Sequence, residues 1–127
     1  MHLVPFLQAP PYEAPGHRQM SMRRLQGREA GPADSVWIGL SSIEPGGGTT
    51  ASASDVEKFY VVVEGRLVVE AVHGDQRSTA ELGPLDSCRI APGESRVLRN
   101  TSSQPCNVLL VMPLPRMDGP QPPARPS

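Results

Sequence analysis

Three polar side chains in strand-like runs of this sequence could do chemistry: Lys58, Tyr60 and Arg96. Tyr60 follows Lys58 by two residues, so in an extended strand their side chains point to the same face. A lysine buried beside an arginine has a lowered pKa, because desolvation and the like charge both disfavour its ammonium. Such an amine can act as a base or as a Schiff-base nucleophile, while an arginine fork can clamp a carboxylate. These three residues are therefore our candidate catalytic residues.

Five further residues are candidates for contact with a small substrate: Ser52, Ser54, Glu57, His17 and Cys88. The two serines would line the wall of a pocket. His17 begins the first strand-like run, which could carry it to the mouth of a barrel. Cys88 has no histidine beside it in the sequence to act as its base, which favours a small buried side chain over a reactive thiol.

Structural alternatives exist for the same residues. The run 57–63 is apolar on both faces, so its register is open, and Lys58 on the outer face would be an ordinary solvated lysine. A bulge in this strand would instead turn Glu57 inward. Arg96 can form a structural ion pair with Asp86 or Glu94, and Tyr60 can belong to the core.

The composition indicates one domain without a charged partner. The chain has 127 residues, with 12 basic and 13 acidic side chains. Its net charge is therefore close to zero, and it lacks the excess of positive charge that holds nucleic acid. No stretch approaches the roughly 20 apolar residues of a membrane span, and the proline-broken start is unlike a signal peptide. The two cysteines, Cys88 and Cys106, lack CxxC spacing, and a reducing, cytoplasmic location is expected.

Short β-type runs separated by Gly- and Pro-containing turns fill the region 19–113. Their spacing of roughly 8–12 residues predicts an all-β sandwich or barrel. A turn is predicted at Pro45-Gly46-Gly47-Gly48. The runs are 20–25, 35–43, 57–63, 66–72, 78–82, 86–90, 95–100 and 106–112. Alternation places Leu67, Val69 and Ala71 on one inward face, and it places Arg96, Leu98 and Asn100 on one shared face.

Both ends of the chain are rich in proline, which cannot donate to a strand ladder. Residues 1–18 are therefore predicted to form an N-terminal arm, and residues 114–127 a disordered tail. The apolar residues of the arm suggest that it lies on a surface, such as that of a second subunit.

The order of these features resembles the cupin superfamily of jelly-roll β-barrels. Pro45-Gly46-Gly47-Gly48 and FYVVVEG (59–65) match the frame of the first cupin motif, and DSCRIAPGESRVLRN (86–100) matches that of the second. The resemblance implies an all-β, cupin-type jelly-roll barrel. It also implies a homodimer, with sheets packed face to face or arms exchanged.

The metal ligands of that family do not carry over to this sequence. The glutamate position falls on Lys58 and the last histidine position on Arg96, while the first two histidine positions fall on Ser52 and Ser54, or on Ala51 and Ala53. Hydroxyls and cations cannot replace imidazoles and a carboxylate around a divalent ion. We therefore expect a metal-independent barrel without a cofactor.

Two functions follow from this substituted pocket. One is an enzyme acting on a small oxo-acid as an isomerase, lyase or decarboxylase, with Lys58 and Arg96 handling the carboxylate. The other is a non-catalytic module that binds a small anionic organic molecule. The sequence names neither the substrate nor the reaction.

Overall fold

The computed structural model describes residues 1–115, and ten strands and two short 3₁₀ helices lie in that range. All eight predicted runs are strands. The first part of the predicted tail, residues 114–115, is described, whereas 116–127 lie outside the described residues. The strands are β1 (Pro11–Tyr12), β2 (His17–Gln26), β3 (Val36–Thr49), β4 (Ser52–Ala53), β5 (Lys58–Glu64), β6 (Leu67–His73), β7 (Gln76–Leu82), β8 (Ser87–Ile90), β9 (Ser95–Arg99) and β10 (Cys106–Pro113), and the helices are η1 (Phe6–Gln8) and η2 (Arg28–Ala30).

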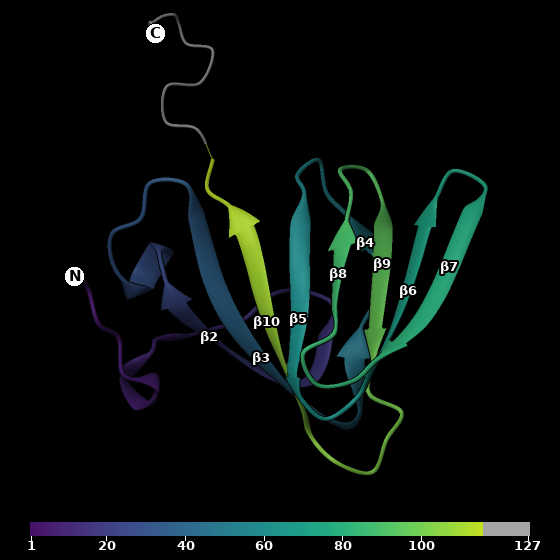
Figure 1. The fold of residues 1–127 in the computed structure, drawn as a ribbon, viewed down its shortest axis with the longest axis horizontal. Helices are drawn as coiled ribbons and strands as arrows, with labels where there is room; N and C mark the ends of the chain where they lie inside the picture. Colours follow the sequence, from purple (N-terminus) through teal and green to yellow (C-terminus); the bar gives the residue numbers. More distant parts are fainter. Residues whose placement is uncertain (116–127) are drawn as a thin grey trace, which may run out of the picture.

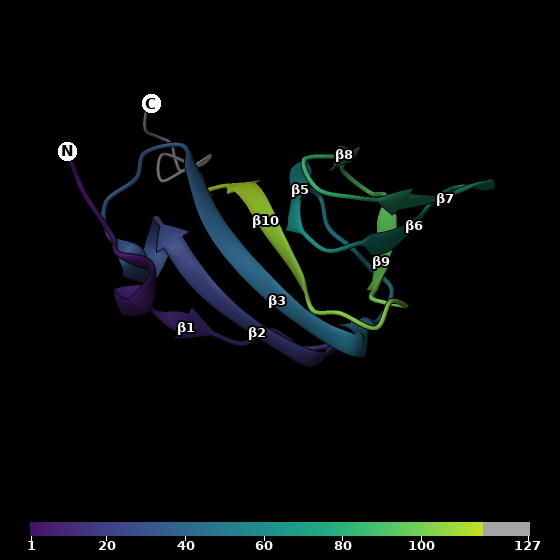
Figure 2. The ribbon, with the colours of Figure 1, turned by 60° about the horizontal axis from the view of Figure 1, so that its bottom comes forward.

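The strands form one rolled sheet in the order β7-β6-β9-β3-β10-β5-β8, and β2 joins it through β3. Every pairing is antiparallel. Figures 1 and 2 show β2, β3, β10 and β5 side by side, with β9, β6 and β7 forming the opposite wall. This nearly closed roll confirms the predicted all-β barrel.

A single long strand, β3, connects the two walls of the barrel. The predicted turn at 45–48 is wrong, because β3 continues through these residues. The glycines let the strand bend between β2 and β9. A Cβ on Gly48 would lie 2.1 Å from the carbonyl oxygen of Leu98, and one on Gly47 would lie 2.7 Å from that of Gln19. Here glycine is needed for close backbone approach, not for reversal of the chain.

The inner face of the roll holds a continuous apolar core. Leu67, Val69 and Ala71 are buried, which confirms the face predicted for β6. Arg96, Leu98 and Asn100 are also buried, so the shared face predicted for β9 is confirmed as the inner one. The other members of the core cluster are Ile43, Tyr60, Val62, Leu82, Ile90, Cys106 and Val108. Lys58 and Arg96 are charged exceptions among the buried residues of this inner face.

The N-terminal arm lies against β2 and η2 of its own chain. The guanidinium of Arg23 donates to the carbonyl oxygens of Phe6 (3.3 Å) and Ala9 (3.1 Å), and His2 Nε2 lies 2.8 Å from the carbonyl oxygen of Ala30. No helix within residues 1–115 is long and apolar enough to span a bilayer. The arm brings Tyr12 to the barrel mouth, where its ring meets Trp37 edge-on at 5.9 Å between centroids.

Candidate functional site

Lys58 and Arg96 both lie inside the barrel, where they are 5% and 6% exposed. They face a cavity of about 150 Å³ that opens between the two walls and the N-terminal arm. Its lining comes from the arm and from β2, β3, β5, β9 and β10. The lining residues are Tyr12, Ala14, His17, Met20, Met22, Trp37, Ser41, Lys58, Tyr60, Arg96, Leu98, Leu110 and Met112.

Strand alternation places Lys58 in this cavity. β5 pairs with β8 in a regular register, with Lys58 opposite Ile90 and Tyr60 opposite Cys88. Lys58, Tyr60 and Val62 therefore share the buried face of β5, while Phe59 is 41% exposed on the other face. The structure thus excludes the outward-facing, solvated lysine that the sequence left open.

A hydrogen-bond network fixes the guanidinium of Arg96. Its Nε donates to the Tyr60 hydroxyl at 2.8 Å, and its Nη1 donates to Thr49 Oγ1 at 3.1 Å and to the Thr50 carbonyl oxygen at 3.2 Å. Thr49 Oγ1 also accepts from the backbone amide of Leu98 at 3.0 Å. Within residues 1–115, Nη2 of Arg96 has no partner. Because the Tyr60 oxygen accepts from Arg96, its proton is free to donate to a molecule in the cavity.

The ammonium of Lys58 has no counter-ion among the described residues. The carboxylates considered from sequence bind elsewhere: Glu57 bonds Arg89, Asp86 accepts from the amide of Gly83, and Glu94 accepts from that of Ala91. Neither Asp86 nor Glu94 forms the ion pair with Arg96 that the sequence left open. Two buried cations therefore face one cavity without a protein carboxylate.

Burial sets the protonation chemistry of the site. Desolvation, and secondarily the positive charge of Arg96, lowers the pKa of Lys58. Desolvation raises the pKa of the Tyr60 phenol, while the charge and hydrogen bond of Arg96 oppose that rise. Tyr60 is therefore a hydrogen-bond donor at neutral pH, and Lys58 releases its proton more readily than a solvated lysine.

His17 is the fourth sequence candidate that reaches the cavity. Its Nδ1 lies 2.9 Å from the Pro15 carbonyl oxygen. Because a carbonyl oxygen only accepts, Nδ1 is the donor in this hydrogen bond. His17 thus adds an imidazole ring to the lining of the cavity.

The remaining four candidates do not line this cavity. Ser52 is exposed on β4, and the Ser54 hydroxyl contacts the Val56 carbonyl oxygen in a local turn. Glu57 bonds Arg89 on the outside of the barrel, and β5 has no bulge beside it that would turn it inward. Cys88 lines a separate cavity of about 180 Å³ beside β6 and β7, and burial raises the pKa of its thiol.

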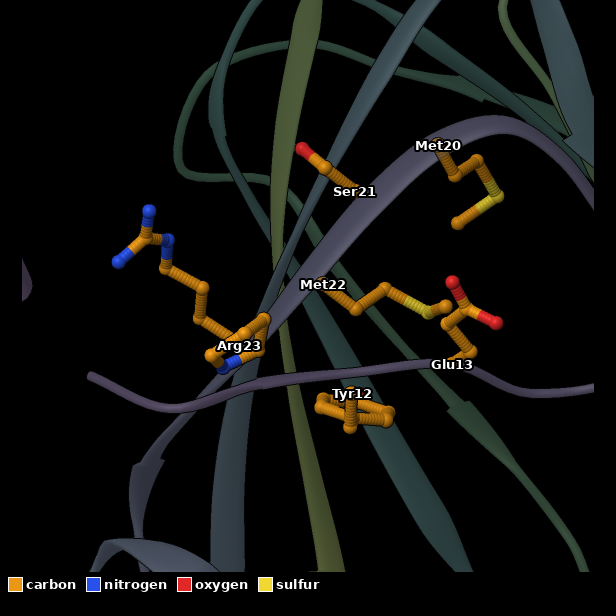
Figure 3. A pocket seen from close by; sticks show the side chains of 7 residues that line it. Tyr12, Glu13, Met20, Ser21, Met22 and Arg23 are labelled. Atoms are coloured by element: carbon orange, nitrogen blue, oxygen red, sulfur yellow. The ribbon is translucent and has the colours of Figure 1, made fainter.

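An open groove of about 420 Å³ runs beside the cavity, between β1 and β2. Figure 3 shows Met20 and Met22 on one side of β2, near Glu13, with Ser21 and Arg23 on the other side. The groove and the cavity share three lining residues: Tyr12, Met20 and Met22. The groove therefore adjoins the cavity at the arm. Glu13 places a negative charge beside the route from the groove into the cavity.

Sequence reasoning missed several residues of the site. Ser41 alternates with Ile43 on the inner face of β3, and a polar residue in that apolar alternation was the available signal. Trp37 lies on the same face, and nothing in the sequence separates this apolar residue from the core. Thr49 directly follows the glycines, and its contact with Arg96 depends on the bend of β3. No sequence pattern indicates that the arm places Tyr12 over the barrel mouth.

The donor set at the former metal-ligand positions does not suit a divalent cation. Lys58 and Arg96 carry positive charge into the cavity, whereas Ser52 and Ser54 do not reach it. Within residues 1–115, no group of three or more His, Cys, Asp or Glu side chains is arranged to hold a metal ion. Two fixed cations would repel a third.

Comparison with known proteins supports the observed fold and identifies the protein family. Residues 39–112 match the cupin domain family. A protein named beta-D-galactosidase Rv1717, from Mycobacterium tuberculosis, is 41% identical over 115 residues, which cover 91% of this chain and 96% of that protein.

Two solved structures share the architecture. The polyketide cyclase RemF from Streptomyces resistomycificus superposes with a TM-score of 0.75 at 27% identity, covering 92% of this chain and 82% of that one. A predicted oxalate decarboxylase from Thermotoga maritima superposes with a TM-score of 0.72 at 19% identity, covering 89% and 99%. With its rolled sheet and the family match over more than half of its length, the chain belongs to the cupin family.

Proposed function

We propose that the cavity binds a small organic carboxylate without a metal ion. The observation that carries this proposal is Lys58, a residue only 5% exposed, whose ammonium has no counter-ion among residues 1–115 and faces the same cavity as Arg96. A buried charge is costly unless it is paired. A ligand carboxylate would supply the missing negative charge and accept from Lys58 Nζ, Arg96 Nη2 and the Tyr60 hydroxyl.

The size of the cavity limits the ligand. A cavity of about 150 Å³ can hold a molecule the size of benzene, so about six to ten non-hydrogen atoms fit within this one. Oxo-acids of three to five carbons lie in this range. A disaccharide would have to extend into the groove beside the arm.

Binding can be tested with a thermal-shift and calorimetric screen of short carboxylates, such as acetate, butanoate, pyruvate and succinate. A ligand should raise the melting temperature of the wild type but not of Lys58→Met or Arg96→Met. Arg89→Met is the matched control, because it removes an exposed arginine that is paired with Glu57 outside the cavity. If none of the acids binds, or if binding survives both cavity variants, the proposal is wrong.

The catalytic version of the proposal gives Lys58 a covalent role. Its neutral amine would attack the carbonyl of a bound oxo-acid, forming an imine and releasing water. Lys58 is the only lysine of the chain, so borohydride reduction followed by peptide mass analysis identifies the adduct without ambiguity. An adduct on the Lys58 peptide with pyruvate or 2-oxoglutarate supports this version. If a ligand binds without any adduct, the non-catalytic binding module is the better description.

The name of the Mycobacterium tuberculosis relative raises a second candidate, hydrolysis of a galactoside. Glycosidases ordinarily use two carboxyl groups flanking the scissile bond. None of the residues lining the Lys58 cavity is aspartate or glutamate. Release of nitrophenol from nitrophenyl β-D-galactoside by the wild type, and its loss in Lys58→Met, would instead support glycoside chemistry in this cavity.

We further propose a cytoplasmic homodimer. The two cysteines are both free, which suits a reducing compartment. The arm also exposes large apolar residues, including Leu3, Phe6 and Leu7, that a second subunit would cover. Light scattering of the full chain, compared with a chain in which Leu3 and Leu7 are serine, tests the dimer. A monomeric mass for the wild type contradicts it.

A further inference from the structure

The N-terminal arm places a phenol inside the barrel that the carboxylate proposal does not use. Tyr12 lies opposite Met22 in the pairing of β1 with β2, and its side chain lines the cavity. A Cβ on Gly39 would lie 3.0 Å from the Tyr12 oxygen, so the hydroxyl lies over Gly39. Gly39 alternates along β3 with the buried residues Trp37 and Ser41. The hydroxyl therefore lies on the inner face of the sheet.

The strand register places this hydroxyl in the same layer of the barrel as Tyr60. Gly39 on β3 pairs with Leu110 on β10, and Leu110 pairs with Tyr60 on β5. Leu110 and Tyr60 both line the cavity, as does Tyr12. A cavity of about 150 Å³ is filled by one molecule the size of benzene. A molecule that fills it and is held by Lys58 therefore also lies against the arm.

The proton of the Tyr12 hydroxyl is available to such a molecule. The Arg24 guanidinium stacks on the Tyr12 ring, with its carbon 3.5 Å from the ring centroid. Arginine carries only donors, so it cannot accept the phenol proton. Burial raises the pKa of Tyr12, while the charge of Arg24 opposes the rise. The phenol is therefore protonated at neutral pH, and none of the residues lining the cavity is an aspartate or glutamate that would accept its proton.

The surroundings of Tyr12 suit an uncharged oxygen better than a second carboxylate. The two cations that line the cavity are Lys58 and Arg96, and the proposed carboxylate uses both. On the side of β2 and the arm, the cavity is lined by the side chains of Met20 and Met22. A second carboxylate against these methionines would be a buried charge without a counter-ion. A hydroxyl or oxo group needs only the one hydrogen bond that Tyr12 can donate.

Resting on the proposed function, we propose that Tyr12 is a specificity-determining residue for a short oxo- or hydroxy-carboxylate. The carboxylate of the ligand is bound by Lys58, Arg96 and Tyr60, and its uncharged oxygen accepts from the Tyr12 hydroxyl. The binding site is therefore complete only when the arm is folded back along β2. Gly39 is part of this arrangement, because a side chain at that position would occupy the space beside the hydroxyl.

The test is isothermal titration of four probes of equal chain length: butanoate, 2-oxobutanoate, 3-hydroxybutanoate and 4-hydroxybutanoate. The best oxygenated acid should bind the wild type about fivefold or more tightly than butanoate, because it gains one hydrogen bond with a buried donor. Tyr12→Phe keeps the ring that stacks on Arg24 and removes only the hydroxyl. It should reduce this preference to less than about twofold and leave butanoate affinity unchanged within about twofold.

Gly39→Ala is the second variant. Its Cβ would lie 3.0 Å from the Tyr12 oxygen, so it should displace the hydroxyl without removing it and reduce the same preference. A preference that survives in both variants overturns the inference. So does an equal loss of affinity for all four probes in Tyr12→Phe, which would mean that the ring only shapes the cavity. Equal affinity of the wild type for all four probes also overturns it but leaves the carboxylate proposal standing, whereas failure of every probe to bind overturns both.

Discussion

Replacing Lys58 with methionine should make the unliganded protein more stable. Methionine has a similar length and fills the same apolar surroundings, but it has no charge to desolvate. Replacing a buried ion pair with apolar residues of similar volume is often neutral or stabilising by about 1–4 kcal/mol, and an unpaired buried charge lacks the partner that offsets its desolvation. Lys58 is 5% exposed and has no ion-pair partner among the described residues. Water in the cavity reduces the penalty, so we expect the lower half of that range, about 1–2 kcal/mol.

This stabilisation corresponds to a measurable change in melting temperature. For a chain of this length, 1 kcal/mol shifts the midpoint by about 3–5 °C. Lys58→Met should therefore melt about 3–10 °C above the wild type in a buffer without carboxylates. Scanning calorimetry at neutral pH measures the difference, and urea unfolding at 25 °C checks it independently.

The difference between the two proteins should depend on pH in a defined direction. The pKa of Lys58 is lowered in the folded chain, while in the unfolded chain it is about 10.4. Between these two values the unfolded state binds more protons, so the stability of the wild type rises with pH. The advantage of Lys58→Met is therefore greatest below the lowered pKa and shrinks as the pH approaches about 10.

A loss of stability in Lys58→Met would refute this reasoning. A decrease of more than about 1 kcal/mol would mean that the ammonium has a stabilising partner in the folded protein. A stability difference independent of pH between 7 and 10 would mean that the amine is solvated.

Four other substitutions test separate parts of the structure. Thr49→Val removes the acceptor shared by Arg96 and an amide, and it should lower the free energy of unfolding by about 1–3 kcal/mol in urea titrations; no change would mean that water replaces the hydroxyl. Gly48→Ala forces a Cβ to within 2.1 Å of a backbone oxygen, so it should destabilise the fold by about 3 kcal/mol or more; wild-type stability would contradict the bend described for β3. Glu13→Gln removes a negative charge beside the approach to the cavity. In stopped-flow measurements it should raise the association rate of an anionic ligand about twofold at low salt, and this gain should disappear at high salt. A gain that persists at high salt would indicate another cause. Glu57→Gln breaks an exposed ion pair outside the cavity and should leave carboxylate affinity unchanged within twofold in calorimetry; a larger change would place Glu57 in the site.

The alternation of apolar and polar side chains predicted the strands, because the inner face of each strand must be apolar. The spacing of the turns predicted where the strands end. Leu67, Val69 and Ala71 show this most clearly. The same alternation placed Lys58 and Tyr60 on one face of their strand. It did not determine whether that face points into the barrel. That choice is made by the pairing of β5 with β8 and β10, which local sequence does not encode.

Other parts of the site depend on contacts between distant segments. The glycines at 46–48 predict a turn when only local conformation is considered, yet the backbones of β2 and β9 approach there and a strand continues. Thr49 meets Arg96 only because of that bend. Tyr12 reaches the barrel mouth because the arm folds back along β2. Sequence periodicity carries no information on either arrangement.

The most direct test of a cationic carboxylate site inside the barrel is nuclear magnetic resonance of the Lys58 side chain. Lys58 is the only lysine, so protein labelled with carbon-13 at lysine Cε gives one signal, which can be titrated without and with succinate. We predict a midpoint below the ordinary lysine value in the free protein. We also predict an upward shift when succinate binds, because a nearby anion favours the ammonium. A midpoint at the ordinary value that succinate does not move would contradict a buried, cationic carboxylate site.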